Sequence, residues 1–102
     1  MIFGLNNDTV DQIKSVFRKH NEIEKVLLYG SRAKGNYRPN SDIDFTILGD
    51  KLDITIMNNI SWELDDLMLP LTFDLSNYKN IVQNDLLEHI QRVGIVFYKK
   101  GD

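Results

Sequence analysis

The chain has 102 residues, a formal net charge of −3 and no cysteine; it can bury one hydrophobic core, and it has neither a disulfide framework nor a thiolate metal site. The weak negative charge argues against binding to a nucleic-acid polymer, which depends on many Lys and Arg contacts to phosphate. No apolar run approaches the roughly 20 residues of a membrane span and the amino terminus lacks a secretory signal, so we expect a cytoplasmic protein without membrane association.

No repeat or Pro/Gly-rich linker divides the chain, and we treat residues 1–102 as a single domain. The spacing of apolar residues predicts an alternation of helices and strands. In chain order these are a helix over about 9–20, strands over 25–29 and 42–48, a helix over about 54–68, a strand over 71–75, a helix around 86–93 and a strand over 94–98. Thr9 and Gln12 have the spacing of a capping box for the first helix, and Pro70 stops the second.

The turn after the first strand has the features of a phosphate-binding site. Gly30 lets the backbone approach a ligand closely, and Ser31 adds a hydroxyl beside its own N–H. The following ten residues contain three cations, Arg32 among them, and no acid, so the loop is locally positive. It matches neither the P-loop nor the dinucleotide-binding pattern. An ordinary glycine turn at a strand end is the alternative for this dipeptide taken alone.

Three aspartates follow the turn in positions that suit metal binding. Asp42 and Asp44 alternate along one strand and therefore share a face, about 6 to 7 Å apart. Mg²⁺ is held by one or two carboxylates plus phosphate oxygens, so this pair is suited to bind a metal–triphosphate complex. Asp74 lies inside a later apolar strand, and beside the first pair it would complete a three-carboxylate site. Solvated acids on edge strands are the alternative for each of these residues alone.

The turn and the aspartates together resemble the minimal nucleotidyltransferases of the DNA polymerase beta superfamily. The signature of that family is an apolar residue with Gly-Ser, about ten residues, and then two acids alternating with apolar residues. Here it reads Tyr29-Gly30-Ser31, ten residues, and Asp42-Ile43-Asp44-Phe45. The fuller forms Gly-Ser-x-Ala-x-Gly, over residues 30–35, and Ser-Asp-x-Asp, over residues 41–44, are also present.

The resemblance implies an α+β, mixed α/β fold in which a mixed sheet carries helices mainly on one face. It also implies two Mg²⁺ ions and transfer of a nucleoside monophosphate from an NTP, with release of pyrophosphate. Asp42, Asp44 and Asp74 would bind the metals, and Asp74 would also help to deprotonate the acceptor. Nucleotide binding would fall to Gly30 and Ser31, with Arg32 and Lys34 as further phosphate contacts.

Small members of this family are paired with helical HEPN-type partners, and some act as antitoxins that add AMP from ATP to a tyrosine of that toxin. This is the leading interpretation, with a homo-oligomer or hetero-oligomer both open. A non-catalytic subunit that binds nucleotide or partner is one alternative, and an adenylyltransferase for a small molecule such as an aminoglycoside is another. Trp62 and Leu69 are candidate docking residues, with a tolerated surface aromatic or burial by the C-terminal strand as the alternative. We expect His20 and His89 to be surface or helix-end residues.

Overall fold

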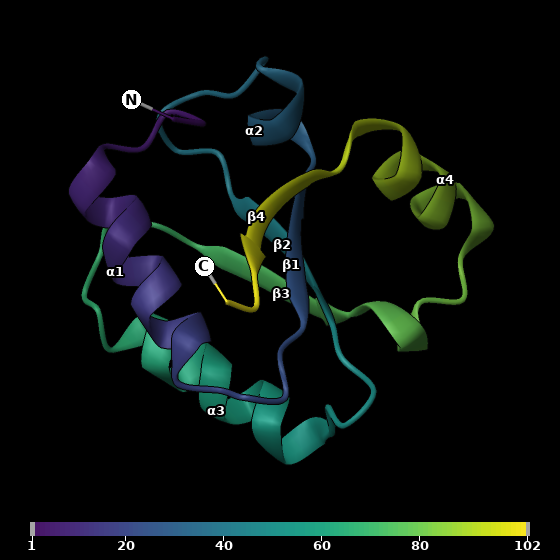
Figure 1. Cartoon of the computed structure of the whole chain (residues 1–102). Helices are drawn as coiled ribbons and strands as arrows, with labels where there is room; N and C mark the ends of the chain where they lie inside the picture. Colours follow the sequence, from purple (N-terminus) through teal and green to yellow (C-terminus); the bar gives the residue numbers. More distant parts are fainter. Residues whose placement is uncertain (1, 102) are drawn as a thin grey trace.

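The computed structural model describes residues 2–101, which form a four-stranded sheet with helices on both faces (Figure 1). The elements in chain order are α1 (Asn7–Arg18), β1 (Lys25–Tyr29), α2 (Ser31–Lys34), β2 (Ile43–Leu48), α3 (Ile54–Asp65), β3 (Phe73–Asn77), the 3-10 helix η1 (Tyr78–Asn80), α4 (Asn84–Val93) and β4 (Ile95–Lys99). This confirms the predicted mixed α/β class. Within this part of the chain, no helix is long and apolar enough to cross a membrane.

The sheet is mixed, with the strand order β3-β2-β1-β4. The central strand β1 is antiparallel to both of its neighbours, β2 and β4, whereas β2 and β3 run parallel. A parallel pair needs a crossover connection, and α3 provides it between β2 and β3. The glycine turn that follows β1 therefore lies at the end of a central strand, as the sequence predicted.

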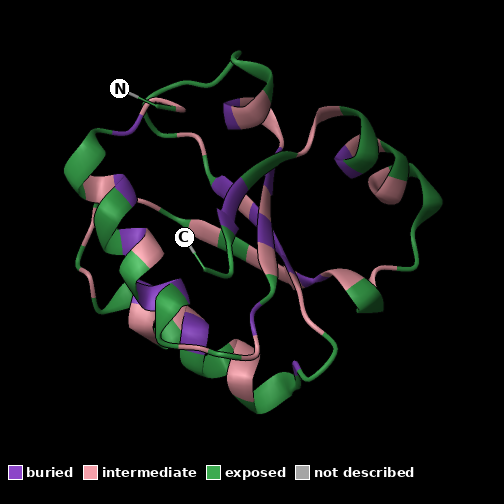
Figure 2. Ribbon diagram, in the orientation of Figure 1, coloured by how far each residue is buried: buried purple, intermediate pink, exposed green. Residues whose placement is uncertain are grey.

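The two faces of the sheet have different environments. Figure 1 shows α1 and α3 on one side of the sheet and α4 on the other. Side chains that alternate along the central strands, such as Leu28 and Phe45, join the hydrophobic core with the inner face of α1. Figure 2 shows this buried set along β1 and β2 and on one side of α1. Because side chains alternate between faces, the intervening residues of β1 and β2 point toward α4.

Several boundaries differ from the prediction for local physical reasons. The first helix begins at Asn7 because Asn6 caps it, with the Asn6 side-chain oxygen accepting a hydrogen bond from the Thr9 N–H at 2.8 Å. The predicted capping box of Thr9 and Gln12 was wrong. The third helical segment ends at Asp65, before Pro70 is reached. The strand β3 is displaced by two residues from its predicted position because its pairing with β2 begins only at Phe73.

Candidate active site at the end of strand β1

Strand register brings the predicted carboxylates to one level of the sheet. Asp44 on β2 lies opposite Tyr29, the last residue of β1, and Asp74 on β3 lies opposite Asp44. Residues opposite one another in neighbouring strands carry their side chains on the same face. Leu28 and Phe45, one step along the two central strands, belong to the core, so Tyr29, Asp44 and Asp74 occupy the α4 side. The strands that carry Asp74 and Asp44 are therefore neighbours, which the sequence had left open.

Gly30 lies directly against the carboxylate of Asp44. Its backbone angles are φ 76° and ψ −157°, a conformation that side-chain-bearing residues rarely adopt. A Cβ atom at this position would collide with Oδ2 of Asp44 and lie 3.2 Å from its Cγ. Glycine is thus required twice, once for the backbone angle and once for the space. The glycine turn and Asp44 are therefore packed against each other as one unit.

The short helix α2 follows immediately and carries the next two candidate residues. Ser31 is its first residue and is half-buried, whereas Lys34, its last, is exposed. The helix closes at Gly35, which has φ 88° and donates its N–H to the Ser31 carbonyl at 2.9 Å. Residues 36–40 are exposed and return the chain to Asp42. The hydroxyl of Ser31 and the exposed ammonium group of Lys34 therefore lie within a few residues of Gly30 in the chain.

The three carboxylates interact electrostatically. Burial raises the pKa of Asp44 above its ordinary value of 3.8, and the negative charges of Asp74 and then Asp42 raise it further. Asp42 and Asp74 themselves are exposed, with Asp42 just before the start of β2. Like charges held this close disfavour the ionised state unless a cation compensates. The protein therefore carries a concentration of negative charge beside a turn suited to phosphate.

The donor set fits a metal ion that is shared with a nucleotide. Among residues 2–101, no three carboxylate, imidazole or thiolate groups are close enough together to enclose a metal by themselves. Mg²⁺ does not need such a cage, since it is commonly held by one or two carboxylates together with phosphate oxygens and water. Asp44, in contact with Gly30, and Asp42, two residues before it, match that requirement.

Arg32, which we expected to contact phosphate, is instead buried within its own loop. It is only 3% exposed, and its guanidinium donates to the carbonyl of Phe3 at 2.8 Å and to that of Pro39 at 3.3 Å. Two further bonds, of 3.1 and 3.0 Å, reach the carbonyl of Ser41. The Tyr37 ring covers the guanidinium, with its centroid 5.4 Å away. The donors of Arg32 are thus engaged by the backbone around the site.

The last helix contributes a residue that sequence reasoning did not assign to the site. The Gly30 N–H donates a hydrogen bond to Nε2 of His89, on α4, at 3.3 Å. The His89 ring also meets the Tyr29 ring edge to face, at a centroid distance of 6.0 Å. His20, the other histidine, lies on the opposite side of the sheet with its Nε2 2.8 Å from Oε2 of Glu63. Nothing local in the sequence indicates the His89 contact, because it joins residues far apart in the chain.

Tyr29 links the turn to the edge strand β3. Burial raises the pKa of its hydroxyl above the ordinary value of 10.0, a hydrogen bond with the side chain of Ser76 acts against this, and the charges of Asp74 and Asp44 add to the increase. The hydroxyl therefore stays protonated at neutral pH and can act as a hydrogen-bond donor. Tyr29 and Ser76 were not predicted as site residues, although Tyr29 is the apolar position of the motif.

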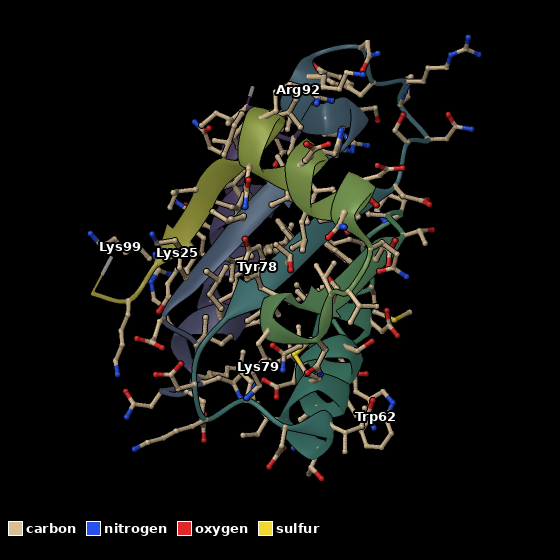
Figure 3. The ribbon with its side chains drawn as sticks, turned by 90° about the vertical axis from the view of Figure 1, so that its right-hand side faces the viewer. Lys25, Trp62, Tyr78, Lys79, Arg92 and Lys99 are labelled. Carbon is tan, nitrogen blue, oxygen red and sulfur yellow. The ribbon has the colours of Figure 1, made fainter. Side chains whose placement is uncertain are left out.

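The two predicted docking residues differ in their environments. Trp62 is 67% exposed and projects from α3 (Figure 3). Leu69 is half-buried and packs against the hydrophobic core, so it is not available as an exposed contact. Trp62 is an exposed surface aromatic, and its role in docking stays a prediction.

The amino-acid sequence of this chain is similar to those of known nucleotidyltransferases. Residues 11–102 match the family model described as polymerase beta, nucleotidyltransferase. A protein of Methanocaldococcus jannaschii to which protein adenylyltransferase activity is ascribed is 46% identical over 41 residues, which are 40% of this chain and 39% of that protein. The matched segment thus spans less than half of the relative.

Known structures share the fold at low sequence identity. A chain in the crystal structure of a toxin–antitoxin with AMP-PNP superposes with a TM-score of 0.70 at 19% identity, covering 95% of this chain and 76% of the other. A chain in the structure of tri-AMPylated Shewanella oneidensis HEPN toxin in complex with MNT antitoxin gives a TM-score of 0.68 at 16% identity, covering 94% and 74%. Both share the arrangement of elements seen here.

Proposed function

Since this chain belongs to the polymerase beta nucleotidyltransferase family, we propose that it transfers a nucleoside monophosphate, AMP from ATP, to a hydroxyl acceptor. The observation that carries this proposal is the contact between the glycine turn and Asp44, in register with Asp74. A phosphate-binding turn and carboxylates at one level of a sheet bring together the two requirements of phosphoryl transfer, positioning and charge compensation.

Each predicted residue has a role that its environment supports. Gly30 lets the triphosphate approach the backbone closely, Ser31 binds it through its backbone N–H and its hydroxyl, and the exposed Lys34 compensates phosphate charge. Asp42, Asp44 and Asp74 would hold the metal ions. Arg32 acts on the nucleotide indirectly, by keeping the loop around the site in place rather than by touching phosphate.

Two Mg²⁺ ions, when bound, supply the positive charge that stabilises the phosphoryl group in transfer and lowers the pKa of the acceptor hydroxyl. The exposed carboxylate of Asp74 takes the proton of that hydroxyl as its oxygen forms a bond to the α-phosphorus. The bond from the α-phosphorus to the bridging oxygen breaks, and pyrophosphate leaves from the turn. Asp74 fits this role because it combines exposure with a register position opposite Asp44.

For the acceptor, we propose a tyrosine of a HEPN-type helical protein, with this chain acting as its antitoxin in a hetero-oligomer. Support comes from two structural neighbours, a toxin–antitoxin complex with AMP-PNP and a complex that contains an AMPylated HEPN toxin. The relative to which protein adenylyltransferase activity is ascribed points to the same reaction class. The open, exposed surroundings of Asp74 would admit a side chain from another protein.

The test is transfer of label from α-³²P-labelled ATP, GTP, CTP and UTP, each with Mg²⁺, to a HEPN-type protein from the same genome. The reaction is run with wild type, with Asp44→Asn, and with Asp11→Asn as a matched control whose carboxylate is exposed on α1. We expect label from ATP on the partner with wild type and Asp11→Asn, and none with Asp44→Asn. A stable complex that never carries label would favour a non-catalytic binding subunit, and label on an added aminoglycoside would favour the small-molecule transferase.

A further inference from the structure

The hydrogen bond between Gly30 and His89 lies just beyond the end of the pairing between β1 and β4. Pairing between β1 and β4 ends at Leu28 and Ile95, so the Gly30 N–H lies beyond the end of that ladder. Gly30 is half-buried, and a backbone N–H shielded from water costs free energy when it lacks an acceptor. Here the acceptor is Nε2 of His89, 3.3 Å away. His89 thus accepts the hydrogen bond that a carbonyl of a neighbouring strand would otherwise accept, at the residue where the chain turns toward α2.

Other contacts hold the imidazole in this position. Its ring meets Tyr29 edge to face, and Tyr29 is the buried last residue of the central strand β1. The next residue of α4, Ile90, is 2% exposed and anchors the helix on the sheet. Figure 3 shows α4 lying in front of the strands, with Arg92 on the same helix labelled. His89 is therefore fixed from two sides, by the aromatic contact and by its helix.

The direction of the bond determines the form of the ring. Because the Gly30 N–H is the donor, Nε2 must present its lone pair, and the proton of the neutral imidazole is assigned to Nδ1. The bond holds the peptide that joins Tyr29 to Gly30. This peptide immediately precedes Gly30, whose positive φ turns the chain out of β1. The next N–H in the chain is that of Ser31.

We propose that His89 is a positioning residue of the nucleotide site, which fixes the Gly30 peptide so that Ser31 is oriented for phosphate before the nucleotide arrives. This inference rests on the proposed function, in which the triphosphate binds at Gly30 and Ser31. It makes α4 part of the site although the helix contributes no group to the phosphates or the metal. Preorganisation of this kind raises affinity because the cost of ordering the turn is met during folding.

The first measurement tests the hydrogen bond itself. Tyr29-Gly30 is the only Tyr-Gly pair in the chain, so labelling tyrosine carbonyl carbons with ¹³C and glycine nitrogens with ¹⁵N isolates the Gly30 amide as one signal. His89→Phe keeps an aromatic ring against Tyr29 but removes the acceptor, whereas His89→Gln restores an acceptor at a similar reach. We expect amide exchange at Gly30 to be about fivefold faster in His89→Phe and to return toward wild type in His89→Gln.

The second measurement tests the link to nucleotide, through the Kd of a non-hydrolysable ATP analogue with Mg²⁺. We expect the affinity of His89→Phe to be about fivefold weaker, with His89→Gln close to wild type. His20→Phe is the matched control, because it removes the histidine bonded to Glu63 away from the turn. It should change neither the Gly30 exchange rate nor the affinity.

The possible outcomes separate the inference from the proposed function. Faster exchange in His89→Phe with unchanged affinity would show a purely structural bond and overturn the inference. Weaker binding with unchanged Gly30 exchange would mean that His89 touches the nucleotide directly, which also overturns it. If wild type binds the analogue and all variants match it, the inference alone fails. If wild type binds no nucleotide, the proposed function fails and the inference fails with it.

Discussion

Gly30 and Asp44 are packed so closely that neither can change without affecting the other. Gly30 has a positive φ and its α-carbon faces the Asp44 carboxylate, which is half-buried and beside two further acids. A side chain on the turn would displace the carboxylate, and an uncharged residue on β2 would remove the repulsion. Substitutions at the two positions should therefore change stability in opposite directions.

Replacement of Gly30 by alanine should impair both folding and binding. The Gly30→Ala side chain would be strained by φ and would also collide with Asp44, so we expect a loss of about 1 to 3 kcal/mol in the free energy of unfolding. Nucleotide affinity should fall at least about tenfold, which isothermal titration calorimetry can measure.

The matched control for this change is Gly35→Ala. Gly35 also has a positive φ, but nothing lies within 4 Å of an added Cβ. Its cost should therefore be backbone strain alone, about 1 kcal/mol, with a smaller effect on affinity. Equal effects of the two substitutions on nucleotide binding would contradict the importance of the Asp44 contact.

Replacement of Asp44 by asparagine should stabilise the metal-free protein. Because the folded-state pKa of Asp44 is raised above 3.8, the folded protein holds this proton more tightly than the unfolded chain does. Wild-type stability therefore falls as pH rises through the window from 3.8 to the raised value, and the penalty persists above it.

Asp44→Asn should thus be more stable than wild type at pH 7, by no more than about 1 kcal/mol because solvent screens a half-exposed group. The difference should vanish below pH 3.8. Thermal melts of both proteins and of Asp11→Asn across this range measure it. A variant less stable than wild type at neutral pH would mean that the carboxylate is stabilising rather than strained.

At the scale of elements, the side chain of one buried arginine, Arg32, holds the connection from α2 to β2 in place by hydrogen bonds. Three backbone carbonyls, from the amino-terminal segment and from the far end of the loop, accept hydrogen bonds from the buried Arg32. The loop itself is otherwise exposed over residues 36–40. A single side chain thus ties the residues before α1 to the residue that precedes Asp42.

Removal of this guanidinium should loosen the loop. Arg32→Met would leave the carbonyls of Phe3, Pro39 and Ser41 without their partner, which should cost about 2 kcal/mol or more. Trypsin should then cut faster after Lys34 and Arg38. Arg38→Met is the control, since Arg38 is exposed and its hydrogen bonds with Ser41 use its backbone N–H and carbonyl. Cleavage after Lys34 at the wild-type rate would refute the assigned role.

At the scale of the whole molecule, an aromatic cluster joins the helix layer to the sheet. Phe45 on β2 packs against Phe17 of α1 at 5.4 Å and against Phe97 of β4 at 4.8 Å between ring centroids. Phe45 and Phe17 are fully buried. The adjacent residue on β2, Asp44, points to the other face, so the cluster also supports the strand that carries the acid.

Truncation of this cluster should be costly across the molecule. Phe45→Ala should lower the free energy of unfolding by about 3 to 5 kcal/mol, because it leaves a cavity among large rings. Urea denaturation followed by circular dichroism measures the loss. Trp62→Ala, which removes an exposed ring from α3, should stay within about 0.5 kcal/mol of wild type. Similar losses for the two variants would contradict the assigned core.

The sequence by itself determined the order of the four strands and of the three longer helices, the central strand and the spacing of the motif, but not the short helices α2 and η1. These follow from local rules: an apolar run ending at Gly30 predicts a buried strand, and period-two alternation puts Asp44 and its neighbours on alternate faces. The motif that joins the turn to the acids is likewise contiguous. Even the cap of α1 was within reach, since Asn6 is a strong capping residue three positions before Thr9.

Only the tertiary structure decided which distant residues complete the site. Strand order put Asp74 beside Asp44, and a long-range contact put His89 on the Gly30 N–H. Carbonyls of the amino-terminal segment and of the loop after α2 accept the hydrogen bonds of Arg32. The physical reason is that hydrogen bonds and packing between distant segments leave no periodic trace in the chain. A charged residue near a phosphate turn looks the same in sequence whether its guanidinium faces a ligand or its own backbone.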